Sequence, residues 1–315
     1  MATSMGFVQG LYCSNINPSN QKSVTLPLLN IKDKYGRTFH LSWIGFFVAF
    51  LSWFAFPPLI HGVVEKDLQL NQTQIANSNI IALLATLLVR LIVGPLCDRY
   101  GPRLVMVGCL LAGAIPTALT PLIKNATGLI IIRFFVGILG GTFVPCQVWT
   151  SQFFDRTIVG RVNALAAGWG NAGGGVTFYL MPAVVSSLID NYGFSQYWAW
   201  RLAFPFCPLV IIVCISIIIL IFGHDTPTGD WNNRHSKQNT EIDSAKIGQD
   251  EDICDKSNAE NLLMMDSQEK HKNPLDICTI AVEDEMPRVP TLKDIWQTAL
   301  STQTLLVALP MFIWF

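Results

Sequence analysis

Charged residues are scarce in this sequence. Only 14% of its 315 residues are Asp, Glu, Lys or Arg, whereas about a quarter of an average soluble domain is charged. With 51% hydrophobic residues and a mean hydropathy of +0.40, this deficit excludes an ordinary soluble enzyme and indicates a chain solvated mainly by lipid. The few charges are unevenly placed, because residues 224–300 carry 16 acidic and 8 basic side chains and the rest of the chain 6 and 13.

The sequence also lacks the patterns of a disulfide-bonded, metal-binding or catalytic protein. Its eight cysteines include no C-x-x-C pair, and about half of them lie in apolar runs, where a thiol acts as a small hydrophobe. No nucleophile–base constellation and no phosphate loop is visible. We expect no enzyme activity, no metal, no cofactor and no nucleic-acid partner. We expect no cleavable signal peptide, since the first apolar stretch begins near residue 39 and is long enough to act as an anchor.

Six apolar segments are long enough to cross a bilayer, which takes about 20 helical residues. A further apolar run begins at Ser301 and reaches only Phe315, so we expect a seventh helix cut short and a chain that is a piece of a longer protein. The predicted fold is an all-α polytopic membrane protein with a six-helix bundle over residues 39–223. The six predicted spans are 39–60, 74–97, 104–123, 128–153, 162–188 and 201–223.

Lysine and arginine gather on one side of these spans. Only Lys66, Lys124 and Arg201 fall on the other side, which predicts that the tail (1–38) and the acidic loop (224–300) are cytoplasmic. The loop has few aromatic residues and is predicted to be a disordered tether. The alternative is regulation by kinases or ubiquitin ligases acting on its Ser, Thr and Lys residues.

Two N-x-S/T sequons agree with this orientation. Asn71 and Asn125 both fall in loops predicted to lie outside the cell. Each is a candidate glycosylation site, and each lies close enough to the bilayer to escape modification.

The segment 94–103, Gly-Pro-Leu-Cys-Asp-Arg-Tyr-Gly-Pro-Arg, joins the second and third spans. Its glycines permit a tight turn, and its arginines hold the loop on the cytoplasmic side. It is similar to the signature loop of the major facilitator superfamily, G-x-x-x-D-R-x-G-x-R. The resemblance implies two six-helix halves with substrate bound between them near the midplane, of which this chain holds the first. It also implies a role in conformational switching for Gly94, Asp98, Arg99, Gly101 and Arg103.

Arg90 is the strongest candidate for substrate binding. It lies eight residues before Asp98, about 12 Å along a helix and therefore near the middle of the bilayer. A charge there costs at least about 2.5 kcal/mol, so the side chain should face a cavity and have a partner. No span contains an interior acid, and a buried cation without an internal anion can bind an external one. The alternative is an arginine satisfied by carbonyls and amide side chains.

Arg133 is the other charge well inside a span. It opens Arg-Phe-Phe-Val-Gly about five residues into the fourth span and resembles another superfamily motif, an early arginine followed by glycine. Because it is nearer the surface it could extend toward water. A structural or coupling role is therefore preferred to ligand binding.

The fifth predicted span is unusually rich in small residues. Positions 164, 168, 172 and 175 form one ridge at helical spacing, which predicts a helix-packing face. Three consecutive glycines, 173–175, exceed what packing needs and weaken a helix by up to about 1 kcal/mol each. They would also let helices slide or let the backbone approach a small ligand. Asn171 adds an amide that could donate to an anion.

Residues 167–175 resemble the glycine-rich nitrate signature of the nitrate/nitrite porter family. The same family is indicated by segments 39–43 and 143–149 and by the position of Arg90 before the signature loop. The long loop is similar to that of fungal members. The resemblance covers about residues 39–223. It implies a high-affinity, proton-driven carrier of nitrate, and possible nitrite transport, in a plasma membrane. The residues it implies for substrate binding are Arg90, Asn171, Phe143 and either Phe47 or Phe50, and the signature glycines are Gly168, Gly170, Gly173, Gly174 and Gly175.

The chemistry of the residues is consistent with that substrate, because guanidinium presents a planar fork of donors to a planar anion. In the family a second arginine, from the other half, completes the grip, so this chain alone is expected to be inactive. Two alternatives stay open: a carrier of another small oxyanion or carboxylate, and a non-transporting membrane sensor or partner-binding half-carrier. The expected partners are the anion and the lipid bilayer.

Overall fold

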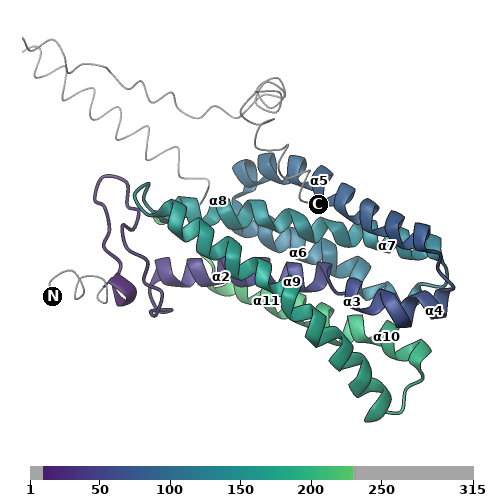
Figure 1. Ribbon diagram of the computed structural model, residues 1–315. Coiled ribbons are helices and arrows are strands. Elements are labelled where there is room, and N and C mark those ends of the chain that lie inside the picture. Colours follow the sequence, from purple (N-terminus) through teal and green to yellow (C-terminus); the bar gives the residue numbers. More distant parts are fainter. Residues whose placement is uncertain (1–9, 230, 232–315) are drawn as a thin grey trace, which may run out of the picture. The chain divides into compact units, whose positions relative to one another are not determined.

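Six helical segments of membrane-spanning length make up the computed structural model, which describes residues 10–229 and residue 231 (Figure 1). The predicted all-helical membrane fold is confirmed. Each span begins before its predicted start, and the first, second and fifth also extend past their predicted ends, because a hydropathy pattern does not register the polar turns with which a helix begins and ends. The six spans are Lys34–Leu68, Gln72–Tyr100, Pro102–Leu122, Ala126–Phe153, Val159–Asp190 and Gln196–Phe222.

Several spans are broken into shorter pieces. The first is interrupted at Gly62, whose φ of +92° lies in the region that favours glycine. The fourth passes through a 3-10 segment in its middle. The pieces are α2 (Lys34–Trp53), α3 (Pro57–Leu59), η1 (Ile60–Val64), α4 (Glu65–Leu68), α5 (Gln72–Tyr100), α6 (Pro102–Ala118), η2 (Thr120–Leu122), α7 (Ala126–Val136), η3 (Gly137–Thr142), α8 (Phe143–Phe153), α9 (Val159–Asp190), α10 (Gln196–Phe204), η4 (Pro205–Leu209) and α11 (Val210–Phe222).

Some predictions fall on residues outside the described part. These are the first nine residues of the tail, almost all of the acidic loop and the start of the seventh span (301–315).

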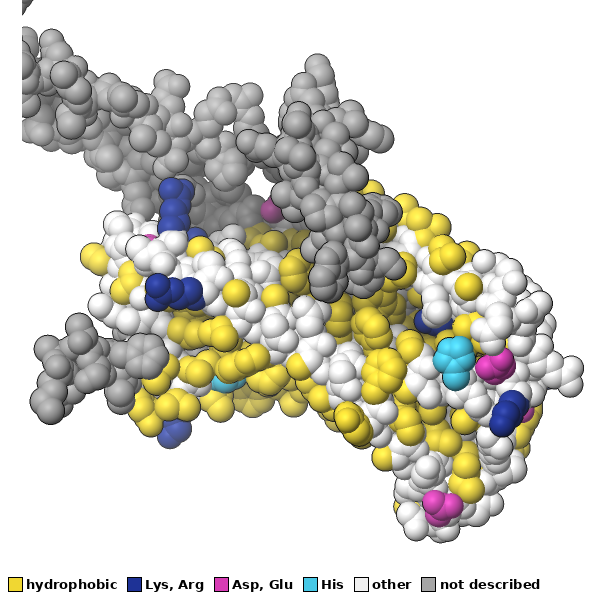
Figure 2. All heavy atoms as spheres, in the orientation of Figure 1, with side chains coloured by type: hydrophobic (Ala, Val, Ile, Leu, Met, Phe, Trp, Pro, Cys, Tyr) yellow, Lys and Arg dark blue, Asp and Glu magenta, His cyan; other side chains and the backbone are white. Residues whose placement is uncertain are grey.

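Helix α2 lies at the centre of the bundle. It packs against α8, α9 and α11, and Figure 1 shows it running beside α9 and α11. Its aromatic residues fill the core: Phe39 and Phe46 are fully buried. By contrast, α5 and α9 leave many large apolar side chains exposed. Figure 2 shows apolar side chains over the middle of the bundle and most of the visible charges toward its two ends, as a lipid-embedded protein requires.

A buried ion pair joins three segments at one end of the bundle. Arg201 of α10 is 1% exposed, and its Nη1 lies 2.6 Å from Oδ2 of Asp67 in α4. The same guanidinium donates to the carbonyl of Ile123 and stacks on the ring of Tyr197. Sequence reasoning counted Arg201 only as a loop charge. The pair fastens α4, α10 and the turn before α7 together.

The tail is anchored at the opposite end, which we call the tail end. Ser23 pairs by backbone hydrogen bonds with Phe153 and Asp155, just after α8. The amides of Asn17 and Asn20 donate to Oδ2 of Asp155, at 3.3 and 2.8 Å. Hydrogen bonds lower the pKa of the Asp155 carboxyl to about 2: that of Asn20 contributes most, followed by those of the Thr157 amide and hydroxyl and then that of Asn17. The carboxylate therefore favours tail docking fully above its ordinary pKa of 3.8, and this contribution is lost as the pH falls toward 2.

We predict that Asp67→Asn destabilises the bundle by about 3 kcal/mol, because it leaves the Arg201 charge buried without its counter-ion. The measurement is thermal unfolding of the purified chain in detergent. The matched control is Asp190→Asn, an exposed acid for which the described residues offer no ion pair. Equal melting temperatures for the two variants would contradict the prediction.

Candidate functional site

Arg90 lies on α5 and reaches across to the fourth span. Its Nε donates to the carbonyl of Gly140 at 3.2 Å, and its guanidinium carbon lies 5.4 Å from the centre of the Phe143 ring. The side chain is partly buried. Within the described residues no acid pairs with it, and Nη1 and Nη2 have no hydrogen-bond partner. One nitrogen is thus fixed while the other two remain available to a ligand.

The acceptor of Arg90 comes from the 3-10 segment η3. In such a segment hydrogen bonds join residues three apart, and a 3-10 stretch inside a longer helix often marks a hinge. Two of its carbonyls accept from α5: that of Gly140 from Arg90, and that of Gly137 from the Thr86 hydroxyl at 2.8 Å. A Cβ at Gly137 would overlap the carbonyl of Ala82. Glycine therefore allows the second and fourth spans to approach closely enough for both bonds.

A line of aromatic contacts runs from Arg90 to the fifth span. The ring of Phe143 lies 5.5 Å from that of Phe46, and Phe46 packs directly against Gly170 of α9. The ring of Phe50 meets that of Phe46 edge to face, with the ring centres 4.4 Å apart. Phe47 faces another way, with its ring next to Trp43. Of the two alternatives for the first span, Phe50 contacts a ring of this line, whereas the ring of Phe47 contacts Trp43. The direct neighbour of Phe143 is Phe46.

The glycine-rich part of α9 packs differently from the prediction. Positions 164, 168, 172 and 175 are all exposed, so the predicted ridge is not a packing face among the described residues. The buried face instead includes Gly170, Gly173 and Gly174, which lie against Phe46, the carbonyl of Phe47 and the ring of Phe54. Small residues occur on both faces of this helix, and spacing alone could not tell which face meets α2.

Asn171 is exposed on α9 and makes no hydrogen bond with the described residues. It directly follows Gly170, at the far end of the aromatic line. Gly168 and Gly175 have open space where a Cβ would be. This face of α9 is therefore free to contact a ligand or another helix.

Arg133 is buried rather than extended toward water. It is 5% exposed, and its Nη1 donates to Ser78 Oγ at 2.9 Å and to Asn79 Oδ1 at 2.6 Å. Its guanidinium also lies over the ring of Phe56, at 5.7 Å. Protein groups thus hold this cation between α7 and α5, which favours the predicted structural or coupling role.

The signature loop turns sharply at Gly101, whose φ is +87°, whereas Gly94 lies inside α5. Arg103 pairs with Asp225 at 2.9 Å and donates to the carbonyl of Gly223. The carbonyl of Asp98 accepts from the indole of Trp231, and Arg99 lies over the ring of Tyr100. The loop is therefore fastened to the chain that follows α11.

The two sequon asparagines lie at helix starts. Asn71 precedes α5, and the side-chain oxygen of Asn125 accepts from the amide of Gly128 in the first turn of α7. Both are exposed. Glycosylation stays a prediction.

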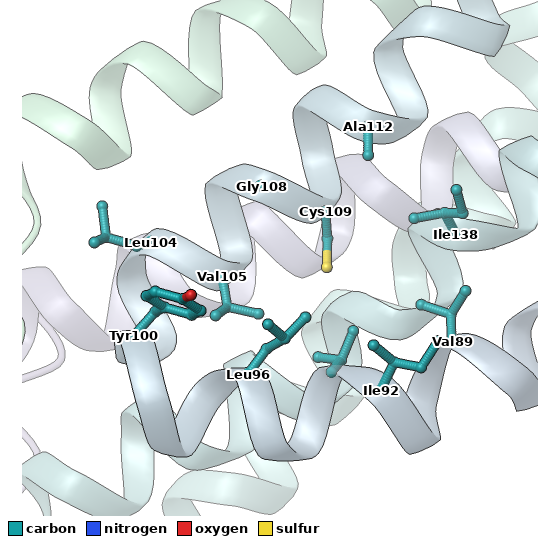
Figure 3. A pocket seen from close by; sticks show the side chains of 11 residues that line it. Val89, Ile92, Leu96, Tyr100, Leu104, Val105, Gly108, Cys109, Ala112 and Ile138 are labelled. Atoms are coloured by element: carbon teal, nitrogen blue, oxygen red, sulfur yellow. The ribbon is translucent and has the colours of Figure 1, made fainter.

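A cavity of about 440 Å³ lies between α5 and α6 (Figure 3). Its lining has no charged side chain and so offers no counter-charge to an anion, and it is not a candidate for the substrate site. The lining residues are Val89, Ile92, Val93, Leu96, Tyr100, Leu104, Val105, Gly108, Cys109, Ala112 and Ile138.

Comparisons with known proteins agree on the class of the chain. A profile of the Major Facilitator Superfamily matches residues 42–315. High affinity nitrate transporter 2.5 of Arabidopsis thaliana is 40% identical over 225 residues, which are 71% of this chain and 44% of that protein. High affinity nitrate transporter 2.7 of the same plant is 34% identical over 223 residues, 70% of this chain and 44% of that protein. The nitrate/nitrite transporter NrtP of Nostoc punctiforme is 32% identical over 228 residues, which are 70% of this chain and 43% of that protein.

The chain belongs to the major facilitator superfamily, since the profile covers far more than half of it. Within the superfamily, the resemblance to the nitrate/nitrite porter family is confirmed by the relatives that match it. The fungal-type assignment rests on the long loop and stays a prediction. The chain spans less than half the length of the relatives compared.

Sequence reasoning missed several residues of the site. The sequence-based candidates on the first span were Phe47 and Phe50, not Phe46. The carbonyl that η3 offers to Arg90 was not predicted either. A signal was present, since Gly137, Gly140 and Gly141 have the small-residue spacing that allows close helix contact.

We predict that Gly173→Ala destabilises the bundle by about 1–3 kcal/mol, because the new methyl group would overlap the backbone carbonyl of Phe47. Gly175→Ala, two residues away in the same helix, meets open space and should be neutral or stabilising by up to about 1 kcal/mol. Thermal unfolding of the two purified variants checks this. A reversed order of stability would show that α2 and α9 do not pack as described.

Proposed function

We propose that this chain forms one wall of a nitrate-binding site in a transmembrane carrier, and that Arg90 binds the anion. The observation that carries the proposal is a half-buried guanidinium with two free nitrogens and no acidic partner in the described residues. The names of the relatives support nitrate as the substrate, with nitrite as a second one. A transporter rather than an enzyme is the class that these relatives favour.

The geometry suits a planar oxyanion. The bond from Nε to Gly140 fixes the plane of the Arg90 guanidinium, so that Nη1 and Nη2 can donate in parallel to two oxygens of nitrate. In a site of low dielectric such a bond is stronger than in water. Phe143 and Phe46 exclude water on one side, and the Asn171 amide is available to donate from α9.

Proton-coupled symport is proposed on the family resemblance. The described spans hold no interior Asp, Glu or Lys. Both ring nitrogens of His40 are hydrogen-bonded: the Trp43 indole donates to Nδ1 at 3.1 Å, so Nε2–H donates to the carbonyl of Leu28. Coupling would then act through Arg90 with its bound anion or through residues beyond those described.

The second candidate is a carrier of another small oxyanion or carboxylate. Two free guanidinium nitrogens would serve nitrite, chlorate or formate as well as nitrate. Competition of each anion against labelled nitrate in an uptake assay separates these substrates. A sensor or partner-binding half-carrier would show binding without flux. We also propose a plasma-membrane location, with the N-terminus and residues 224–300 on the cytoplasmic side, and regulation of this loop by kinases or ubiquitin ligases.

We predict that Arg90→Ala lowers nitrate uptake at least about 100-fold in cells that express the carrier containing this chain, because the ligand loses both donors and the charge. Nitrate uptake by Arg90→Lys should also fall well below that of the wild type, since an ammonium group keeps the charge but lacks the planar pair of donors. Labelled nitrate uptake is the measurement, normalised to carrier at the membrane.

Arg161→Ala is the matched control, since it removes an exposed arginine of the first turn of α9. It should leave uptake within about twofold of the wild type. Normal uptake by Arg90→Ala at equal surface expression would remove Arg90 from the site.

We further predict that residues 1–315 expressed alone give no nitrate flux, because the proposed site has only one wall in this chain. Reconstituted liposomes loaded with a nitrate-sensitive dye provide the test. Flux above that of empty liposomes would show that the chain is complete in function.

A further inference from the structure

A second cavity, which is polar and has a volume of about 430 Å³, lies at the tail end of the bundle. It is formed where α2 and α6 begin and where the chain leaves α11. Unlike the cavity between α5 and α6, its lining is rich in charged and hydroxyl groups. The lining residues are Lys34, Arg103, Gly223, His224, Asp225, Thr226, Pro227, Thr228 and Gly229.

The cavity is electropositive. Lys34 donates one hydrogen bond, to the carbonyl of Pro227 at 3.1 Å, and an ammonium group has two more donors to give. Arg103 pairs with Asp225, the one acid of the lining, and His224 lies next to Arg37, with Nε2 3.3 Å from a guanidinium nitrogen. Lys34 and Arg103 also lie in the first turns of α2 and α6, whose N-termini each add about half a positive charge.

The flanking helices place this cavity next to lipid. The last turns of α11 expose Ile217, Ile221 and Phe222, and the first turn of α6 exposes Leu104. Apolar side chains left exposed on membrane-spanning helices face acyl chains or another helix. The cavity therefore lies at the level where a lipid headgroup would lie, beside a surface suited to its chains.

We propose that this cavity binds the phosphate of an anionic phospholipid headgroup. The charge-derived orientation puts the tail end on the cytoplasmic side, where the leaflet carries anionic lipids that attract basic groups near its surface. The Asp225 carboxylate forms an ion pair with the Arg103 guanidinium, and a phosphate would compete with Asp225 for that guanidinium. The site is separate from Arg90 and is independent of which anion the carrier transports.

The test is titration of the purified chain, in neutral detergent, with short-chain phosphatidylserine and phosphatidylcholine, read by native mass spectrometry. The wild type should bind phosphatidylserine more tightly than phosphatidylcholine. Lys34→Gln should weaken phosphatidylserine binding about fivefold, which is the effect of one basic residue near a membrane surface. Asp225→Asn should strengthen it, a direction that misfolding cannot produce.

Lys32→Gln is the matched control, because it removes the same charge from an exposed residue that does not line the cavity. Equal weakening by Lys32→Gln and Lys34→Gln, or equal binding of the two lipids, would overturn the proposal. So would displacement of phosphatidylserine by an equal concentration of inorganic phosphate, which would make the site one for a soluble phosphate.

Discussion

A guanidinium inside the bilayer needs acceptors, and the region around Arg90 is arranged to meet that constraint. The span that carries Arg90 offers it none, because a helix uses its own carbonyls. The nearest acceptor is a carbonyl of η3, and reaching it requires α5 to lie close to the fourth span. The aromatic contacts through Phe143 and Phe46 then connect this pair of helices to α2 and α9. Close approach of helices is what brings the site together.

Glycine supplies that approach at two places. Gly137 and Gly140 allow α5 to meet the fourth span, and Gly170 and Gly173 allow α9 to meet α2. In lipid there is little hydrophobic drive between helices, so such contacts depend on packing and on hydrogen bonds between them. Arg133, buried against Ser78 and Asn79, adds a polar link of this kind between α5 and α7. Arg133 and Arg90 thus differ: the hydrogen-bonding groups of Arg133 are satisfied by protein, those of Arg90 only in part.

Much of the fold could be predicted from the sequence because each span follows from length and hydropathy. Arg90 could be found as well, since a charge far from both span ends is costly and conspicuous. The faces of the helices could not be predicted. Small residues lie all round α9, so spacing favoured Gly168 and Gly175, whereas Gly170 and Gly173 are the buried ones. The choice between Phe46 and its neighbours depends on helix rotation, which a local pattern does not contain. The Arg201–Asp67 pair joins residues too far apart in the chain to be matched by spacing.

The use of a main-chain oxygen to hold Arg90 has a consequence for the variation this protein can tolerate. No substitution at position 140 removes the main-chain carbonyl, so the acceptor for Arg90 is present whichever residue occupies that position. The hydrogen bond from Arg90 can be lost only when a bulkier residue at position 140 pushes the two spans apart. A Cβ at Gly140 would overlap Thr86. Neutral drift in this part of the fourth span is therefore limited by the size of the residue, and hardly by its polarity.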